Sequence, residues 1–164
     1  MSIISYMSPS RVLSLLPDDN VNTPNISFTL INSVCTASGA GVIEDTTVDF
    51  IAAGVEAGDI IYDDTAGRVD DVTGVVSRTQ VNTQFGHVTV GDSYRIFSGT
   101  NPGGGVLLVT GLTSGGLQQV VTMDGDIVQV GVWGIGNIIP LRVKKVFRTA
   151  GVTVTAPTYC MLWD

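Results

Sequence analysis

The first candidate for chemistry is Ser93, which follows Gly91 and Asp92 and could act as the nucleophile of a hydrolase. A serine hydroxyl becomes a good nucleophile only when a positioned base accepts its proton. The chain contains a single histidine, His87, and none follows it. We therefore interpret the triplet as a turn that leads into a β-strand, and we predict no catalytic residue and no enzymatic activity.

The same histidine and the two cysteines do not indicate a metal or cofactor site. A lone imidazole needs Cys or carboxylate partners to hold a transition metal, and no such cluster surrounds His87. Cys35 and Cys160 are far apart and lack a C-x-x-C partner, so they indicate neither a zinc site nor a disulfide framework. Both lie in apolar stretches, where a free cysteine behaves as a small hydrophobic residue. We expect no cofactor and a reducing cytosol.

Four carboxylates, in Asp63-Asp64 and Asp70-Asp71, form the densest group of possible cation ligands. Ca²⁺ prefers oxygen ligands, so these side chains could cradle it. However, their spacing does not match an EF-hand loop, and Arg68 between the pairs could neutralise part of the charge. We favour an acidic hairpin edge that discourages edge-to-edge strand pairing. We assign no metal site, and Ca²⁺ binding by the four carboxylates stays open.

Aromatic residues near the C-terminus allow two interpretations. Exposed together, such rings could form a platform for carbohydrate, whereas each of them lies in an apolar run that favours packing in a core. We favour core packing. The residues concerned are Trp133, Phe147, Tyr159 and Trp163.

The charge balance points away from nucleic acid and towards protein partners. The net charge is -7, whereas a nucleic-acid surface needs a basic face. We interpret the one basic cluster, Arg142, Lys144, Lys145 and Arg148, as a solvated or interface-facing strand. Charged residues make up only 14% of the chain, so much of its surface is neutral. A subunit that buries such a surface in an assembly avoids nonspecific association.

The first 24 residues are expected to form an extended arm. They show neither the early positive charge nor the apolar run of a signal peptide, and no stretch of the chain approaches a membrane span. Ser8 and Pro9 could start a short helical turn that Pro17 ends. One or two helical turns are unstable alone, so the arm must dock on a partner. The predicted partner-binding residues are Val12, Leu13, Leu15 and Leu16.

The rest of the sequence predicts an all-β protein. Short alternating segments over residues 25–100, separated by Gly or Asp turns, predict a small β-barrel or sandwich module. A glycine-rich linker is expected at residues 101–105, because consecutive glycines do not fit a regular element at low cost. Residues 106–164 then predict a second, antiparallel β module, with a hairpin turn at Asp124-Gly125.

Two pairs of segments resemble a known class of proteins. Val55–Tyr62 followed by Gly91–Phe97 resembles a small β module that recurs in virion proteins of tailed bacteriophages. Pro140–Phe147, followed by the stretch from Gly151 to Trp163, is similar to the ends of small phage head proteins. The resemblance implies a capsid decoration (cement) protein. The alternative is a head fibre, connector or tail component that could bind glycans or a receptor.

That resemblance also implies the partners. We expect the chain to bind the major capsid protein or other virion proteins, to form a homo-oligomer, and to bind neither nucleic acid nor membrane. A trimer is favoured because decoration proteins of this kind often sit at capsid three-fold positions, and closed symmetric oligomers are usual. The expected location is the virion, assembled in the cytoplasm of a bacterial host.

Overall fold

The computed structural model describes residues 11–149 and 151–163, and it confirms the all-β prediction. Within those residues the only helical segment is a 3-10 turn at Ile26–Phe28, and every strand pairing is antiparallel. The chain divides into two compact units, one made of Val21–Pro102 and the other of Met1–Asn20 with Gly103–Asp164. Each unit is described by itself below.

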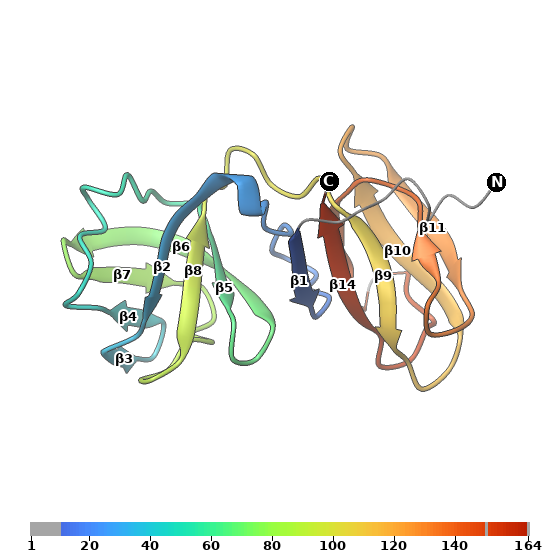
Figure 1. Cartoon of the computed structure of the whole chain (residues 1–164), viewed down its shortest axis with the longest axis horizontal. Helices are drawn as coiled ribbons and strands as arrows, with labels where there is room; N and C mark the ends of the chain where they lie inside the picture. The colour runs from blue at the N-terminus through green and yellow to red at the C-terminus, as the bar shows by residue number, and fades with distance from the viewer. Residues whose placement is uncertain (1–10, 150, 164) are drawn as a thin grey trace. The chain divides into compact units, whose positions relative to one another are not determined.

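The unit Val21–Pro102 is a single curled sheet (Figure 1). Its seven strands are ordered β2-β8-β5-β6-β7-β4-β3. The curl brings the inward side chains of distant strands together around one core, as predicted for a small barrel or sandwich. The strands are β2 (Thr29–Val34), β3 (Ala37–Gly39), β4 (Val42–Glu44), β5 (Ile60–Asp63), β6 (Arg68–Ser77), β7 (Gln80–Thr83) and β8 (Ser93–Phe97).

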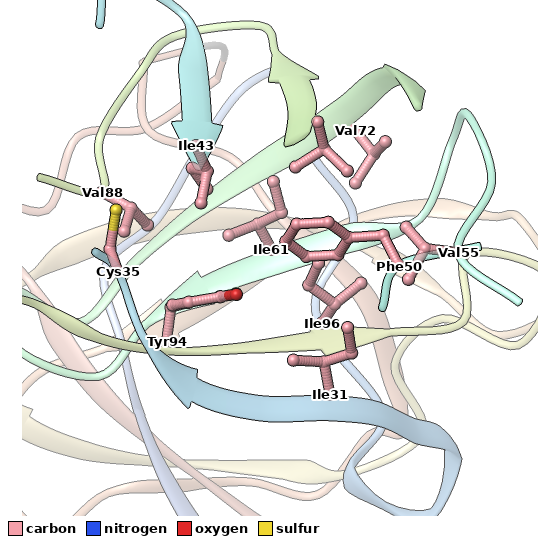
Figure 2. Packing of buried hydrophobic residues seen from close by; sticks show 11 residues of the cluster. Ile31, Cys35, Ile43, Phe50, Val55, Ile61, Val72, Val88, Tyr94 and Ile96 are labelled. Carbon is pink, nitrogen blue, oxygen red and sulfur yellow. The ribbon is translucent and has the colours of Figure 1, made fainter. Parts of the chain in front are cut away.

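The core of this unit lies on the concave side of the sheet. Figure 2 shows Phe50, from the loop after β4, in the middle of a cluster of aliphatic side chains. Tyr94 and Ile96 reach the same cluster from β8, because alternate residues of a strand point to one face. The other members are Ile31, Cys35, Ile43, Val55, Ile61, Val72, Val81 and Val88.

The second unit is built from two separate sheets. One has the order β1-β14-β9-β12, and the other has the order β11-β10-β13. The turn at Asp124-Gly125 joins β10 to β11, as the sequence predicts. The strands are β1 (Arg11–Leu15), β9 (Val106–Gly111), β10 (Gly116–Thr122), β11 (Ile127–Val132), β12 (Ile138–Ile139), β13 (Val143–Val146) and β14 (Thr158–Trp163).

A buried polar link joins the two sheets of this unit. Tyr159 in β14 donates its hydroxyl hydrogen to the Oε1 atom of Gln118 in β10, at 2.7 Å. The amide nitrogen of Gln118 donates to the carbonyl oxygen of Phe147 at 2.7 Å, so both ends of the buried amide are satisfied. Because a buried polar group without a partner is costly, this bond favours one alignment of the two sheets.

The predicted short helical turn before Pro17 is wrong. Residues Arg11–Leu15 form strand β1, which pairs along its whole length with β14. Leu13 and Leu15 are only 2% and 1% exposed. The strand wins over the helix because pairing with β14 satisfies its backbone and buries these leucines, whereas one helical turn gains little alone.

The expected docking arm is therefore corrected in part. Two of the four predicted partner-binding residues, Leu13 and Leu15, are covered by the chain itself, while Leu16 is half-buried. The side chain of Val12 and residues 1–10 lie outside the described part of the structure.

Candidate functional site

The four clustered carboxylates are the densest group of possible cation ligands in the sequence, and the structure uses them within the fold. Asp63 and Asp70 are both 2% exposed, and their strands β5 and β6 lie inside the sheet rather than at its edge. The interpretation as an acidic edge that prevents strand pairing is therefore wrong. Asp63 caps its own turn by accepting the N–H groups of Thr65 and Ala66.

Asp70 organises a loop that is distant in sequence. Its Oδ1 atom accepts the backbone N–H groups of Gln84 and Phe85 at 3.1 and 3.0 Å. Its Oδ2 atom accepts from Gly86 at 2.9 Å and from His87 at 3.4 Å. A concave run of N–H groups is the arrangement that proteins use to bind anions. Here the side chain of Asp70 is itself the anion in that site.

The other two carboxylates of the group do not join them in a cation site. Asp64 forms an ion pair with Arg95, whose guanidinium also lies over the ring of Tyr62, 5.4 Å from its centroid. Asp71 is half-buried in β6. Within residues 11–149 and 151–163, no three His, Cys, Asp or Glu side chains gather as metal ligands.

The candidate nucleophile has no base beside it. Ser93 is exposed at the start of β8, and its N–H donates to the hydroxyl of Thr65 at 3.2 Å. The carboxylate of Asp92 closes the preceding turn by accepting from the hydroxyl and N–H of Thr89, and these bonds lower the pKa of Asp92. The ring of His87 stacks on Phe85 instead of meeting the serine.

Buried polar groups in the core of the unit Val21–Pro102 are linked by hydrogen bonds. The hydroxyl of Tyr94 donates to Asp45 at 2.9 Å, and burial together with this bond raises the pKa of Tyr94. Burial alone would raise the pKa of Asp45, but hydrogen bonds from Ser33, Thr47 and Tyr94 outweigh it and lower that pKa. Burial also raises the pKa values of the free thiols of Cys35 and Cys160. Cys35 lies in the unit Val21–Pro102 and Cys160 in the other unit. A raised thiol pKa makes both cysteines less reactive at neutral pH.

The basic cluster does not form one continuous strand. Strand β13 covers only Val143–Val146, and Lys145 donates its Nζ hydrogen to the carbonyl oxygen of Asn20 at 2.9 Å. The backbone N–H of Arg148 donates to Asp19 at 2.8 Å. At least two of the basic positions therefore help to fix the segment that follows β1.

The aromatic residues behave differently from one another, and the core interpretation is wrong for Trp133. Tyr159 is fully buried and Phe147 half-buried, but Trp133 is 73% exposed. The side chain of Trp163 lies outside the described part of the structure. Trp133 comes directly after β11, where alternation turns its side chain to the same face as Gly131.

Trp133 belongs to an apolar area that we call the Trp133 surface. Its members are Leu117 and Ile127 on the outward face of β10 and β11, and Trp133 and Ile135 directly after β11. Gln119 and Gln129 lie on the same face between Leu117 and Ile127. Ile127 and Ile135 are 61% and 69% exposed. Exposed apolar groups that share one face indicate a protein interaction site. The sequence analysis missed this face because β11 is apolar at nearly every position, which is typical of a strand covered on both sides.

A second surface feature lies in the unit Val21–Pro102. A shallow depression of about 580 Å³ is lined by Asn82, Gln84 and Phe85 together with residues 40–42. The two amides and the ring are exposed. Amide groups beside an exposed aromatic ring are suited to bind a sugar weakly.

The comparisons with known proteins give no relative. No protein-family model, no curated protein and no solved structure matches this chain. Among the described residues, no helix is long and apolar enough to span a membrane.

Proposed function

We propose that the chain is a non-enzymatic structural subunit of a tailed-phage particle, a capsid decoration (cement) protein that binds the major capsid protein. The observation that carries this proposal is the Trp133 surface, an apolar face in a chain with only 14% charged residues. Tryptophan and other large apolar side chains dominate the energetics of protein interfaces. The resemblance of Val55–Tyr62 and Gly91–Phe97 to phage virion modules supports the choice of particle.

Three observations disfavour an enzyme, a metal-binding protein and a nucleic-acid-binding protein, and so support the same proposal. Ser93 has no base within hydrogen-bond distance among the described residues, and the acidic cluster is used within the fold. A net charge of -7 disfavours binding to nucleic acid. The proposed location is the virion, after assembly in the bacterial cytoplasm. The trimer expected from the resemblance stays a prediction. A two-fold dimer is the alternative to it, and sedimentation of the purified chain distinguishes the two.

The experiment is co-expression with the major capsid protein that the proposal requires in the same phage genome, followed by sedimentation of the assembled heads. We expect the wild-type chain to sediment with the heads. The double variant Trp133→Ser, Ile135→Ser should bind at least about tenfold more weakly, because it removes two exposed apolar anchors. The control is Val90→Ser, since Val90 is 60% exposed but lies in the other unit. Heads that carry no bound chain, or a double variant that binds like wild type, would contradict the proposal.

A head-fibre, connector or tail component with glycan-binding activity is the second candidate. It is favoured by the depression beside Asn82, Gln84 and Phe85. In a glycan array, this function predicts binding that Phe85→Ala abolishes and Trp133→Ser leaves unchanged. Absence of any bound glycan would remove this candidate.

A further inference from the structure

The outer edge of β11 is an open strand edge. β11 is the terminal strand of its sheet, with β10 on one side and no described strand on the other. Soluble proteins usually protect such an edge with a charged side chain, a proline or a bulge. The six residues of β11, Ile-Val-Gln-Val-Gly-Val, include none of these. The edge is thus available for pairing with another strand.

The hydrogen-bond pattern shows which backbone groups this edge presents. Thr122 donates its N–H to the carbonyl oxygen of Asp126 at 2.9 Å, so these two residues form a hydrogen-bonded pair of the β10–β11 ladder. Such pairs alternate along an antiparallel ladder. The N–H and C=O groups of Ile127, Gln129 and Gly131 therefore point outward, and no described residue bonds to them.

We propose that this edge pairs with the same edge of a second copy of the chain, antiparallel and with Gln129 on the two-fold axis. In that register Gln129 meets Gln129 of the other copy, and Ile127 meets Gly131. All three residues with outward backbone groups then find partners on both chains. The two three-stranded sheets become one continuous six-stranded sheet.

The side chains fit this register. A Cβ atom on Gly131 would lie 2.6 Å from Nε1 of Trp133, so the indole covers this glycine. Ile127 of the second copy would lie opposite Gly131 and pack against that indole. Pairing of a large side chain with an aromatic-covered glycine is a known way to stabilise adjacent strands.

The positions of the carboxylates and of the Trp133 surfaces are also compatible with this register. In this register Asp126 lies opposite Val132 and Asp124 opposite Gly134, so no carboxylate faces another. The two-fold axis is perpendicular to the sheet, which places both Trp133 surfaces on the same side of the pair. The inference does not depend on the proposed function, but it would double the apolar area presented to a partner.

The test uses the full chain without any particle. Sedimentation velocity should show a dimer for the wild type. Gln129→Lys and Gln129→Glu should each raise the dimer Kd by roughly tenfold or more, because position 129 would meet its own charge across the axis. An equimolar mixture of the two variants should restore the dimer, because opposite charges then meet. Gln129 is exposed, so circular dichroism should show that both variants are folded.

Three outcomes would overturn the inference. The first is a wild-type chain that is monomeric at all concentrations. The second is an oligomer, such as a trimer, that neither variant weakens. The third is a pair of monomeric variants that do not associate when mixed. None of these outcomes bears on binding to heads, so failure here is separable from failure of the proposed function.

Discussion

At the scale of single residues, the carboxylate of Asp70 shows how an acidic cluster can be structural. It collects backbone N–H groups from residues 84–87, which lie on a different loop. Within that loop, a Cβ atom on Gly86 would lie 2.7 Å from the backbone nitrogen of Gly41. Only a glycine allows this approach, and its φ of +68° also favours glycine. The conformation of this loop therefore depends on the carboxylate of Asp70 and on the glycine at position 86.

We predict that Asp70→Asn lowers the free energy of unfolding by about 2–3 kcal/mol, because hydrogen bonds to a charged group are stronger and an amide turns N–H groups toward the loop. Urea unfolding followed by circular dichroism measures this change. The matched control is Asp64→Asn, which removes the same charge from a partly exposed ion pair and should cost less than about 1 kcal/mol. Equal effects of the two substitutions would contradict this role for Asp70.

Among the strands, the position of β1 changes the interpretation of the N-terminal segment most, because the sequence predicts a docking arm there. It lies at the edge of the β1-β14-β9-β12 sheet, nearly the whole chain length away in sequence from its partner β14. Leu13 and Leu15 are buried there, and each buried leucine contributes about 1.5–3 kcal/mol. Residues 11–15, which the sequence analysis assigns to a docking arm, thus contribute to the core of their unit.

We predict that deleting residues 1–15 unfolds this unit and leaves Val21–Pro102 folded. Amide hydrogen exchange followed by mass spectrometry measures the two units separately, because peptides from residues 103–163 and from residues 21–102 are distinguished by their sequences. The double variant Leu13→Ala, Leu15→Ala should show a milder loss of several kcal/mol, in the range of about 4–8. The control Leu117→Ala, at a residue on the Trp133 surface, should cost less than about 1 kcal/mol. Unchanged amide exchange in residues 103–163 after the deletion would refute this account of β1.

At the scale of the whole molecule, each of the two units has a buried tyrosine hydroxyl as part of its core. Tyr94 bonds to Asp45 in one unit, and Tyr159 bonds to Gln118 in the other. Burial raises the pKa of both hydroxyls above the ordinary value of 10.0, and for Tyr94 the bond to Asp45 adds to the effect. The folded state therefore keeps both groups neutral at a pH where the unfolded chain ionises them.

The sign of the pH dependence follows from these raised values. The stability from each neutral tyrosine is complete below pH 10 and is lost as the pH rises further, by about 1.4 kcal/mol per pH unit for each group. Urea titrations between pH 8 and pH 11 measure the slope, to which the buried thiols contribute from pH 9 upward. Tyr94→Phe with Tyr159→Phe should remove the tyrosine contribution to the slope above pH 10 and leave that of the two thiols. A slope that this double variant leaves unchanged would disprove the assignment.

The fold class and the local turns could be predicted from the residues alone. Alternating apolar residues with β-branched side chains predict strands, because a strand places alternate side chains on one face. The hairpin at Asp124-Gly125 was predictable because its conformation needs a residue with positive φ, which Gly125 adopts at 93°. The absence of long helical periodicity likewise predicted a chain without an α-helix among its described residues. These features depend only on neighbouring residues.

The role of each candidate residue, in contrast, depends on tertiary contacts. That β1 pairs with β14, that Asp70 holds a distant loop, and that β11 leaves one edge open all depend on contacts between segments far apart in sequence. The apolar runs around Leu13 and around Trp133 look alike in the sequence, yet one is buried and the other exposed. The difference arises because a strand's surroundings are set by which other strands pair with it and cover it, and this information is not local.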